Sequence, residues 1–455
     1  MTGILRSRIG KLLPGRGWLA PAIVSVLILA ATFACSPNFR YASGPAASPY
    51  AGDFLQEWIG GHIVRGGEYA RFYDVAYARQ LQHDAALVGF EWDRSRYLPI
   101  VYPPFYYLLV SPLSCLSLPI AAWVWSALMV GCLVAAVWIT VLNSKHSVPG
   151  TVLHPSPAKV PSTYLPWLLP AALVFMPTLE SLTTCQKGPL CLLILTATYV
   201  LLSRGRNFTA GVIFGLIAFK PQLALVIAVA MLCKQQWRFV LGGATTGSAL
   251  VGLCFLLGPD VCRQYFAFST GAADYIHTGG YDLTKSHCWY GFFTLLDQGQ
   301  ASAWVKPVTF VAGALTIAFL SLLLRGKLEL SQSRFATQFS GLILATILLS
   351  PHLFTYDLMI LLLPMYLLGK QFSGAGQGSV PPVVGGLLVT IYVAAGVSPA
   401  VTAATGVQLV PLLLAGLLMT ISRKPLLRCG IAQLAGDAEA EVTFRGVRLE
   451  EPARR

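Results

Sequence analysis

The sequence predicts an all-α fold, a polytopic transmembrane helical bundle, and three observations support this prediction. Of the 455 residues, 55% are hydrophobic and only 11% are charged, whereas a soluble protein carries about a quarter charged residues. Apolar runs of the length that spans a bilayer occur at 18–35, 120–142 and 240–258. Basic residues cluster in short segments between such runs. We therefore expect the lipid bilayer to be the main partner of this chain.

The first apolar run follows a basic segment, 1–17, as it would in a cleavable signal sequence. The run is long for a signal core, and the letters CSPNF at its end make a poor small-residue cleavage site. We therefore expect a retained first helix and a cytosolic amino terminus.

The remaining basic clusters set the topology, because Lys and Arg favour the cytosolic side. Placing 203–206, 234–238, 325–327 and 423–428 in the cytosol predicts about twelve crossings within 18–422 of a cell (plasma) membrane protein and a cytosolic tail at 423–455. The crossings are expected near 18–35, 120–142, 164–182, 189–203, 208–219, 221–233, 239–258, 303–324, 335–350, 353–369, 381–397 and 407–422. Orientation accounts for most of the net charge of +13, so we do not expect nucleic acid as a partner.

A long first outer loop, 36–119, is expected to hold interfacial helices. Its segment 99–119 is apolar enough to cross, but four prolines interrupt it. We expect this segment to lie at the outer interface, with Tyr102, Tyr106 and Tyr107 at the level of the headgroups.

The same topology places several polar stretches on the outer face, namely 51–74, 183–189, 219–222, 281–291 and 350–357. Orientation was chosen from charge alone, so this convergence independently supports it. The sequence thus predicts a site over the extracytoplasmic end of the bundle.

Asp53 has two interpretations. Gln56 stands three residues later, so Asp53 resembles a helix N-cap with its reciprocal partner. Phe54, Leu55 and Trp58 would then begin an apolar face lying on the bilayer or on the bundle. Alternatively, the carboxylate is a general base that takes a proton from a hydroxyl at the membrane surface.

Lys220 and His352 also have two interpretations each. Lys220 lies between two short apolar helices, so it either snorkels to the interface or binds an anion such as a lipid-linked phosphate. His352 ends a late span and is either a cap or interface residue, or a group that contacts a phosphate or orients the acceptor.

Further candidate substrate contacts are aromatic, amide and basic residues of the outer segments: Trp58, Tyr102, Gln186, Lys187, Lys285, His287 and Tyr356. No Cys or His spacing indicates a metal site, so we expect neither a metal nor a cofactor. Cys262 and Cys288 share a predicted outer loop, so a disulfide between them is left as an open alternative.

The positions of the polar residues along the chain distinguish a transporter, a channel and an enzyme. A transporter or flippase of lipid-linked sugars would place charges in mid-span and show repeat symmetry, and a channel would line its helices with polar residues. Here the ionisable residues gather at one face. An enzyme acting on lipid-linked substrates fits best, and the transporter stays as the alternative.

The passages 53–75, 102–130, 179–228 and 348–368 together resemble glycosyltransferase family 87 in order and spacing. The resemblance implies the GT-C architecture, a polyprenyl-phosphate sugar donor, a lipid or glycan acceptor, and an extracytoplasmic active site. The donor sugar it favours is mannose. It implies that Asp53 is the base, that attack inverts the anomeric carbon, and that Lys220 and His352 serve the donor phosphate. One departure concerns 185–188, where the family reads Gly-Gln-x-Asn and this chain reads Cys-Gln-Lys-Gly.

Overall fold

The computed structural model describes residues 18–40, 47–145, 165–278, 282–328, 330, 333–372 and 382–423. This part of the chain is helical, with a single isolated antiparallel bridge between Ser286 and Phe354. The all-α prediction is confirmed. The predicted amino-terminal segment 1–17 and nearly all of the predicted tail lie outside the described residues.

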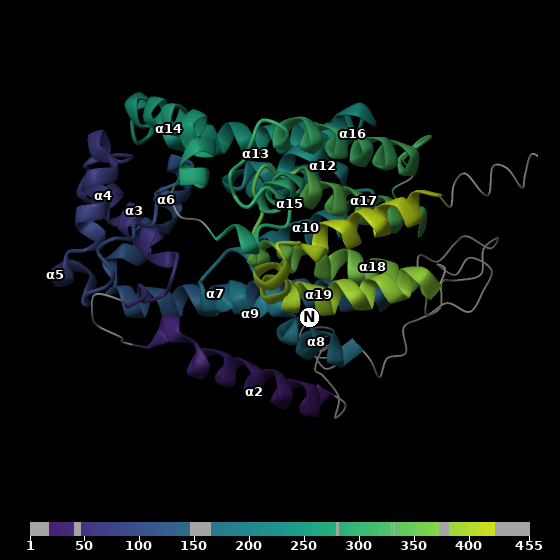
Figure 1. The fold of residues 1–455 in the computed structure, drawn as a ribbon, viewed down its shortest axis with the longest axis horizontal. Coiled ribbons are helices and arrows are strands. Elements are labelled where there is room, and N and C mark those ends of the chain that lie inside the picture. The colour runs from purple at the N-terminus through teal and green to yellow at the C-terminus, as the bar shows by residue number, and fades with distance from the viewer. Residues whose placement is uncertain are drawn as a thin grey trace, which may run out of the picture.

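The first half of the described residues holds the helices α2 to α11. They are α2 (Leu19–Cys35), α3 (Phe54–Gly66), α4 (Val75–Gln82), α5 (Ala85–Val88), α6 (Pro104–Val110), α7 (Leu118–Lys145), α8 (Leu168–Val174), α9 (Met176–Thr183), α10 (Gly188–Ser203) and α11 (Asn207–Gly215). In Figure 1, α3 to α6 gather at one end of the bundle, and α2 lies along its edge.

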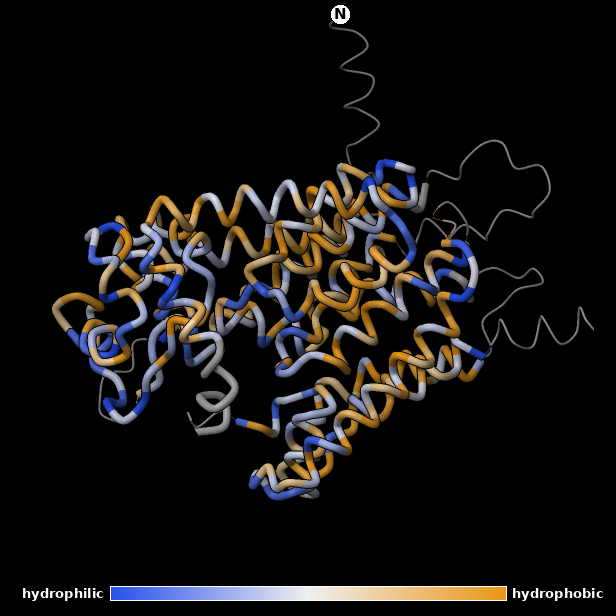
Figure 2. The backbone as a smooth tube through the Cα atoms, turned by 90° about the horizontal axis from the view of Figure 1, so that it is seen from above, coloured by the Kyte–Doolittle hydropathy of each residue, from blue (hydrophilic) through white to orange (hydrophobic). Residues whose placement is uncertain are grey.

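The helices of the second half complete the bundle. They are α12 (Pro221–Cys233), α13 (Trp237–Phe255), α14 (Pro259–Thr278), α15 (Trp289–Leu296), α16 (Val305–Leu323), α17 (Ser333–Leu349), α18 (Leu362–Phe372), α19 (Pro382–Thr405) and a last helix, Leu409–Arg423. Figure 2 shows hydrophobic residues predominating along the long helices, with hydrophilic stretches toward their ends.

The chain is a multi-pass membrane protein. Among the described residues, four helices (α7, α13, α16 and α19) are long and apolar enough to cross a membrane, or up to five spans if a bent pair counts as one. Their outward faces carry large apolar side chains, of which Phe310 is 81% exposed, as contact with lipid requires. The other apolar helices are shorter, so the number of about twelve crossings stays a prediction.

The predicted crossing at 164–182 is not one continuous helix. Residues Leu165–Val174 and Met176–Thr183 meet at 64°, and Phe175 between them is extended. Pro177 explains the break, because its ring would clash with the carbonyl of Leu173 in a continuous helix. The bend brings the carboxyl end of α9 to the polar turn at 184–188.

The basic loops meet one another at one end of the bundle. Arg204 reaches the side chain of Asn143 at 3.4 Å, and Lys234 donates to the carbonyl of Gly326 at 3.0 Å. Helix α10 links this end to the polar turn that precedes Gly188. Arg204 and the polar turn therefore lie at opposite ends of α10, and which side of the membrane each faces stays a prediction.

The segment 99–119 forms no long helix, because its prolines limit α6 to seven residues followed by the 3-10 helix Ser111–Cys115. The expectation that its tyrosines lie at the headgroups is wrong. Tyr102, Tyr106 and Tyr107 are buried, and the Tyr106 hydroxyl donates to Glu57 on α3. The ring bodies fill the core while the hydroxyls serve buried polar groups.

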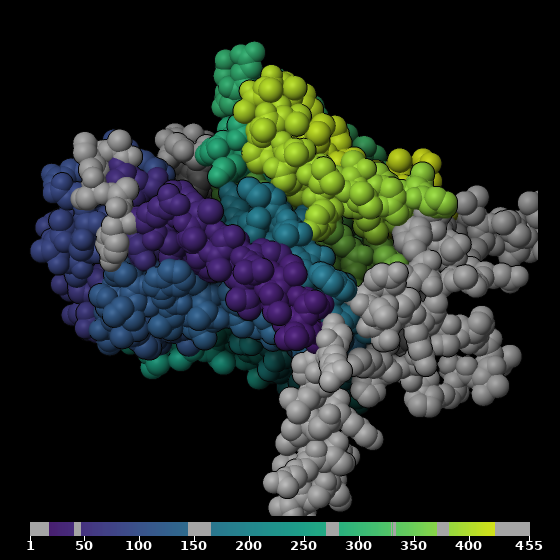
Figure 3. All heavy atoms as spheres, turned by 90° about the horizontal axis from the view of Figure 1, so that it is seen from below, coloured from purple at the N-terminus to yellow at the C-terminus, as the bar shows by residue number. Residues whose placement is uncertain are grey.

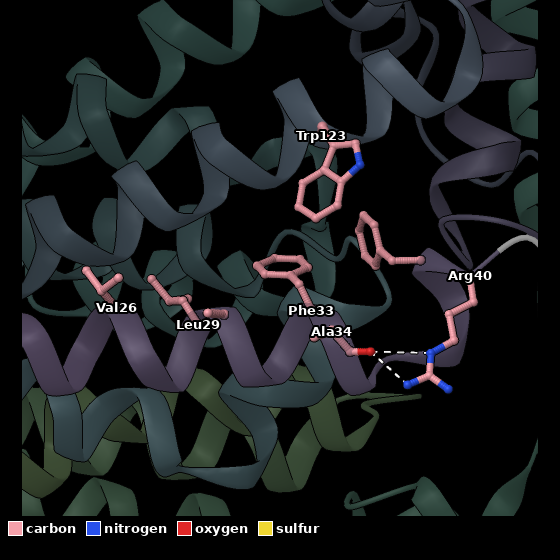
Figure 4. Close-up of a pocket in the computed structure, with 8 residues that line it drawn as sticks. Val26, Leu29, Phe33, Ala34, Arg40 and Trp123 are labelled. Atoms are coloured by element: carbon pink, nitrogen blue, oxygen red, sulfur yellow. Dashed lines mark hydrogen bonds between the residues drawn. The ribbon is translucent and has the colours of Figure 1, made fainter.

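An apolar groove of about 570 Å³ opens between α2 and α7 (Figure 4). It is lined by Val26, Leu29, Ala30, Phe33, Ala34, Phe39, Arg40 and Trp123. Arg40 stands at its end and donates to the Ala34 carbonyl at 2.8 Å. Figure 3 shows α2 lying across the outside of the bundle, so this groove belongs to the apolar surface rather than to the polar site.

Close packing of α11 on α13 depends on small residues. A Cβ at Gly211 would lie 2.0 Å from the Phe239 carbonyl oxygen, and one at Gly242 would lie 2.1 Å from that of Phe208. Gly215, four residues after Gly211, completes a G-x-x-x-G pattern, which lets membrane helices approach closely.

We predict that Gly242→Ala lowers the free energy of unfolding by about 1–3 kcal/mol, because the added methyl group meets backbone in a packed interface. Gly247→Ala is the matched control on the same helix, since no atom lies within 4 Å of its added Cβ. Denaturation in mild detergent measures both variants. Equal stabilities would contradict the tight α11–α13 contact.

Candidate active site

Asp53 stands immediately before α3, at the N-cap position, but its side chain makes no capping bond. Its Oδ2 accepts a hydrogen bond from the Gln186 amide. Gln56, the expected capping partner, instead accepts from the Tyr107 hydroxyl at 3.4 Å. The capping interpretation therefore does not hold, and the carboxylate faces the turn at 184–188.

The loop before Asp53 is fixed against α9 and the turn after it. Asn38 accepts from the Ala51 backbone at 2.8 Å and donates to the Thr183 carbonyl at 3.0 Å. Gly52 has a φ of +56°, and a Cβ there would lie 3.3 Å from the Thr184 backbone. Glycine at this position lets the chain bring Asp53 up to Gln186.

One helical turn after Asp53, Glu57 forms an ion pair with Lys187, and the side chains of both are fully buried. Glu57 also accepts from the Tyr106 hydroxyl, and the Lys187 ammonium lies 3.9 Å from the centroid of the Tyr102 ring. Burial raises the pKa of Glu57 and lowers that of Lys187, while their mutual attraction acts in the opposite sense on each.

A second buried pair joins Lys220, between the short helices, to Asp357 at 2.5 Å. The Tyr356 ring centroid lies 5.2 Å from the same ammonium. Lys220 therefore neither snorkels to the interface nor stands free, because Asp357 supplies its counter-charge.

His352 lies beside this pair and is half-buried. One of its ring nitrogens is 3.3 Å from the Gln222 amide nitrogen. Burial lowers the pKa of His352, Asp357 raises it and Lys220 lowers it. His352 thus lies within the electrostatic reach of the Lys220–Asp357 pair.

Lys285 pairs with Glu180 at 2.9 Å, and its side chain is 43% exposed. This pair is the most accessible of the three lysine–carboxylate pairs around the site. It completes the polar cluster, which we define as Asp53, Glu57, Glu180, Gln186, Lys187, Lys220, Lys285, His352 and Asp357.

Two candidates have structural contacts instead. His287 is fully buried, its Nε2 is 3.0 Å from the Thr355 hydroxyl, and burial lowers its pKa to about 3. Its backbone donates to Leu353, so it joins the 282–288 segment to the segment after α17. Trp58 donates to the Leu116 carbonyl at 3.1 Å and stacks on the His62 ring.

Asp53 differs from Glu57, Glu180 and Asp357 in its direct partner, which is a neutral amide instead of a lysine. Burial raises its pKa, while the Gln186 hydrogen bond and the charges of Lys187, Lys220 and Lys285 lower it. Although deep among protein atoms, Asp53 keeps accessible surface. A carboxylate with a raised pKa and an open face is suited to accept a proton near neutral pH.

From the sequence alone, Glu57, Asp357, Glu180 and Tyr106 have no predicted site role. A signal existed for Glu57, because a residue four positions after Asp53 shares its helix face. In the part of the chain that the structure describes, no three His, Cys, Asp or Glu side chains are grouped as metal ligands.

The fold and the polar cluster define a multi-pass helical membrane protein with acids and lysines gathered around a partly accessible carboxylate. The model of glycosyltransferase family 87 matches residues 100–351, more than half of the chain, and this chain belongs to that family. Comparisons with curated proteins and with solved structures gave no match. Asp53 precedes the matched region and His352 follows it directly, whereas Gln186, Lys187 and Lys220 lie within it.

We predict that Lys187→Met lowers the free energy of unfolding by about 3–5 kcal/mol, because it leaves the buried Glu57 charge unpaired. Lys285→Met, in a partly exposed pair, should cost only about 0–1 kcal/mol. Denaturation of the purified chain in detergent compares them. A Lys187→Met variant as stable as Lys285→Met would show that Glu57 is not held as a charged partner.

Proposed function

We propose that this family 87 glycosyltransferase moves a hexose from a polyprenyl-phosphate sugar to a hydroxyl of a lipid-linked or glycan acceptor. Mannose is the hexose we favour. The reaction takes place at the extracytoplasmic end of the bundle in the cell membrane, with both termini in the cytosol. Family membership favours a transferase over the transporter alternative.

One observation carries the choice of base. Within the described cluster, Glu57, Asp357 and Glu180 each form an ion pair with a lysine, whereas Asp53 has only a neutral amide donor. A paired carboxylate is a weak proton acceptor, because protonation breaks its ion pair. Asp53 is therefore the acid of this cluster best suited to act as a general base.

The proposed step balances as follows. The acceptor hydroxyl gives its proton to Asp53 while its oxygen forms a bond to the anomeric carbon. The bond from that carbon to the phosphate oxygen breaks, and the lipid phosphate leaves with the electron pair. Attack from the face opposite the phosphate inverts the anomeric centre, and the good leaving group needs no separate acid.

Lys220 and His352 are proposed to serve the departing phosphate, whose negative charge grows as the bond breaks. Lys220 is paired with Asp357 at 2.5 Å. Its ammonium can therefore bind a phosphate only if it contacts both anions or leaves Asp357 for the phosphate. His352 and Lys285 are more accessible and would meet the phosphate first.

We predict that Asp53→Asn lowers sugar transfer by about 10²–10⁴-fold, because the amide cannot accept the proton. Membranes holding each variant are supplied with radiolabelled polyprenyl-phosphate mannose and a phosphatidylinositol mannoside acceptor. Asp84→Asn is the control from the same loop, where Asp84 only caps α5, and its rate should match the wild type. Wild-type transfer by Asp53→Asn would remove Asp53 as base.

We predict that the double variant Lys220→Met/Asp357→Asn, which removes both charges of the pair, lowers kcat about tenfold or more with little change in the acceptor KM. The double change avoids an unpaired buried charge. Steady-state kinetics with the same donor measure it. An unchanged kcat would dismiss the phosphate role of Lys220.

A further inference from the structure

The residues Gln186 and Lys187 are consecutive, and they contact two acids that lie one helical turn apart. Gln186 donates to Asp53, and Lys187 pairs with Glu57. The turn at 184–188 is therefore joined to the start of α3 by two adjacent contacts. One contact reaches the accessible carboxylate, and the other lies fully buried beneath it.

The buried contact leaves Lys187 little freedom. Its ammonium lies 3.9 Å and 5.3 Å from the centroids of the Tyr102 and Tyr106 rings, and Tyr106 also donates to Glu57. Lys187 thus contacts aromatic faces on one side and a carboxylate on another, so its position defines that of the turn.

The rest of the turn is held as firmly. The Trp125 indole donates to the Cys185 carbonyl at 2.9 Å, and the Gln186 backbone donates to Ser181 at 2.7 Å. A Cβ at Gly188 would lie 3.0 Å from the Tyr356 carbonyl oxygen. A displacement of this turn would therefore disturb several elements at once.

We propose that Glu57 and Lys187 are positioning residues of the transfer reaction: their buried pair fixes the 184–188 turn to α3, so that the Gln186 amide stays on the Asp53 carboxylate. This inference rests on the proposed role of Asp53 as base. Neither Glu57 nor Lys187 needs to touch a substrate, because both act through Gln186.

The consequence is a change in the titration of Asp53. The groups that face Asp53 are Gln186, Glu57 and the lysines 187, 220 and 285. The Gln186 hydrogen bond stabilises the ionised carboxylate, so its loss raises the pKa of Asp53. Transfer requires ionised Asp53, and the acid limb of the rate profile therefore moves to higher pH.

The experiment is a mutant cycle on the full chain, with polyprenyl-phosphate mannose as donor and a phosphatidylinositol mannoside as acceptor. It compares Gln186→Met, Glu57→Gln/Lys187→Met and their combination. We expect each to move the acid limb of kcat/KM upward by about one pH unit. We also expect kcat to fall about tenfold with KM within twofold, and the combination to match the more impaired parent.

Asp260→Asn/Arg263→Met is the control, since this pair on α14 is exposed and should leave the profile unchanged. An acid limb that stays at the wild-type pH, or effects that multiply in the combination, would overturn the inference. If Glu57→Gln/Lys187→Met lacks a cooperative melting transition, Gln186→Met alone tests the inference, through the shift of its acid limb of kcat/KM to higher pH. Asp53→Asn separates the two proposals: wild-type activity there rejects the base itself, whereas an inactive Asp53→Asn with an unmoved acid limb rejects only the positioning.

Discussion

The pairing of buried charges is the constraint on which this end of the molecule depends. An isolated ion costs several kcal/mol to bury, so each lysine in the interior needs a carboxylate partner. Lys187 therefore draws the turn after α9 onto α3, and Lys220 draws the start of α12 onto the 3-10 helix Thr355–Leu361. These pairs organise the site, and they leave Asp53 without a cationic partner of its own.

The helices could be predicted because hydrophobic runs are local. The long apolar runs at 18–35, 120–142 and 240–258 fall almost entirely within α2, α7 and α13, and the break at Phe175 has a local cause in Pro177. The partners within the site could not be predicted in the same way. Lys187 and Glu57 stand 130 positions apart, and Lys220 and Asp357 stand 137 apart. Composition and periodicity contain no information about such contacts.

The tyrosines of 99–119 also show that distant partners cannot be predicted from the sequence alone. A ring with a polar tip suits the membrane interface and a buried polar cluster equally well. The prolines of this segment and the suitability of tyrosine for the headgroup level predict the interface. Tyr106 instead meets Glu57, from which it is separated by 49 positions. Only the tertiary structure distinguishes these two environments.

The departure from the family pattern at 185–188 now has a physical interpretation. Cys185 has a φ of +52°, a left-handed conformation that glycine adopts without strain, so a glycine at this position would fit the same backbone. At position 188 the space around the residue, rather than its φ, favours glycine. A side chain there would meet the Tyr356 carbonyl oxygen at 3.0 Å and the Met359 sulfur at 3.2 Å. Glycine at position 188 therefore lets the segment that carries Asp357 pack closely on the turn beside Gln186, because any larger residue there would have to displace that segment.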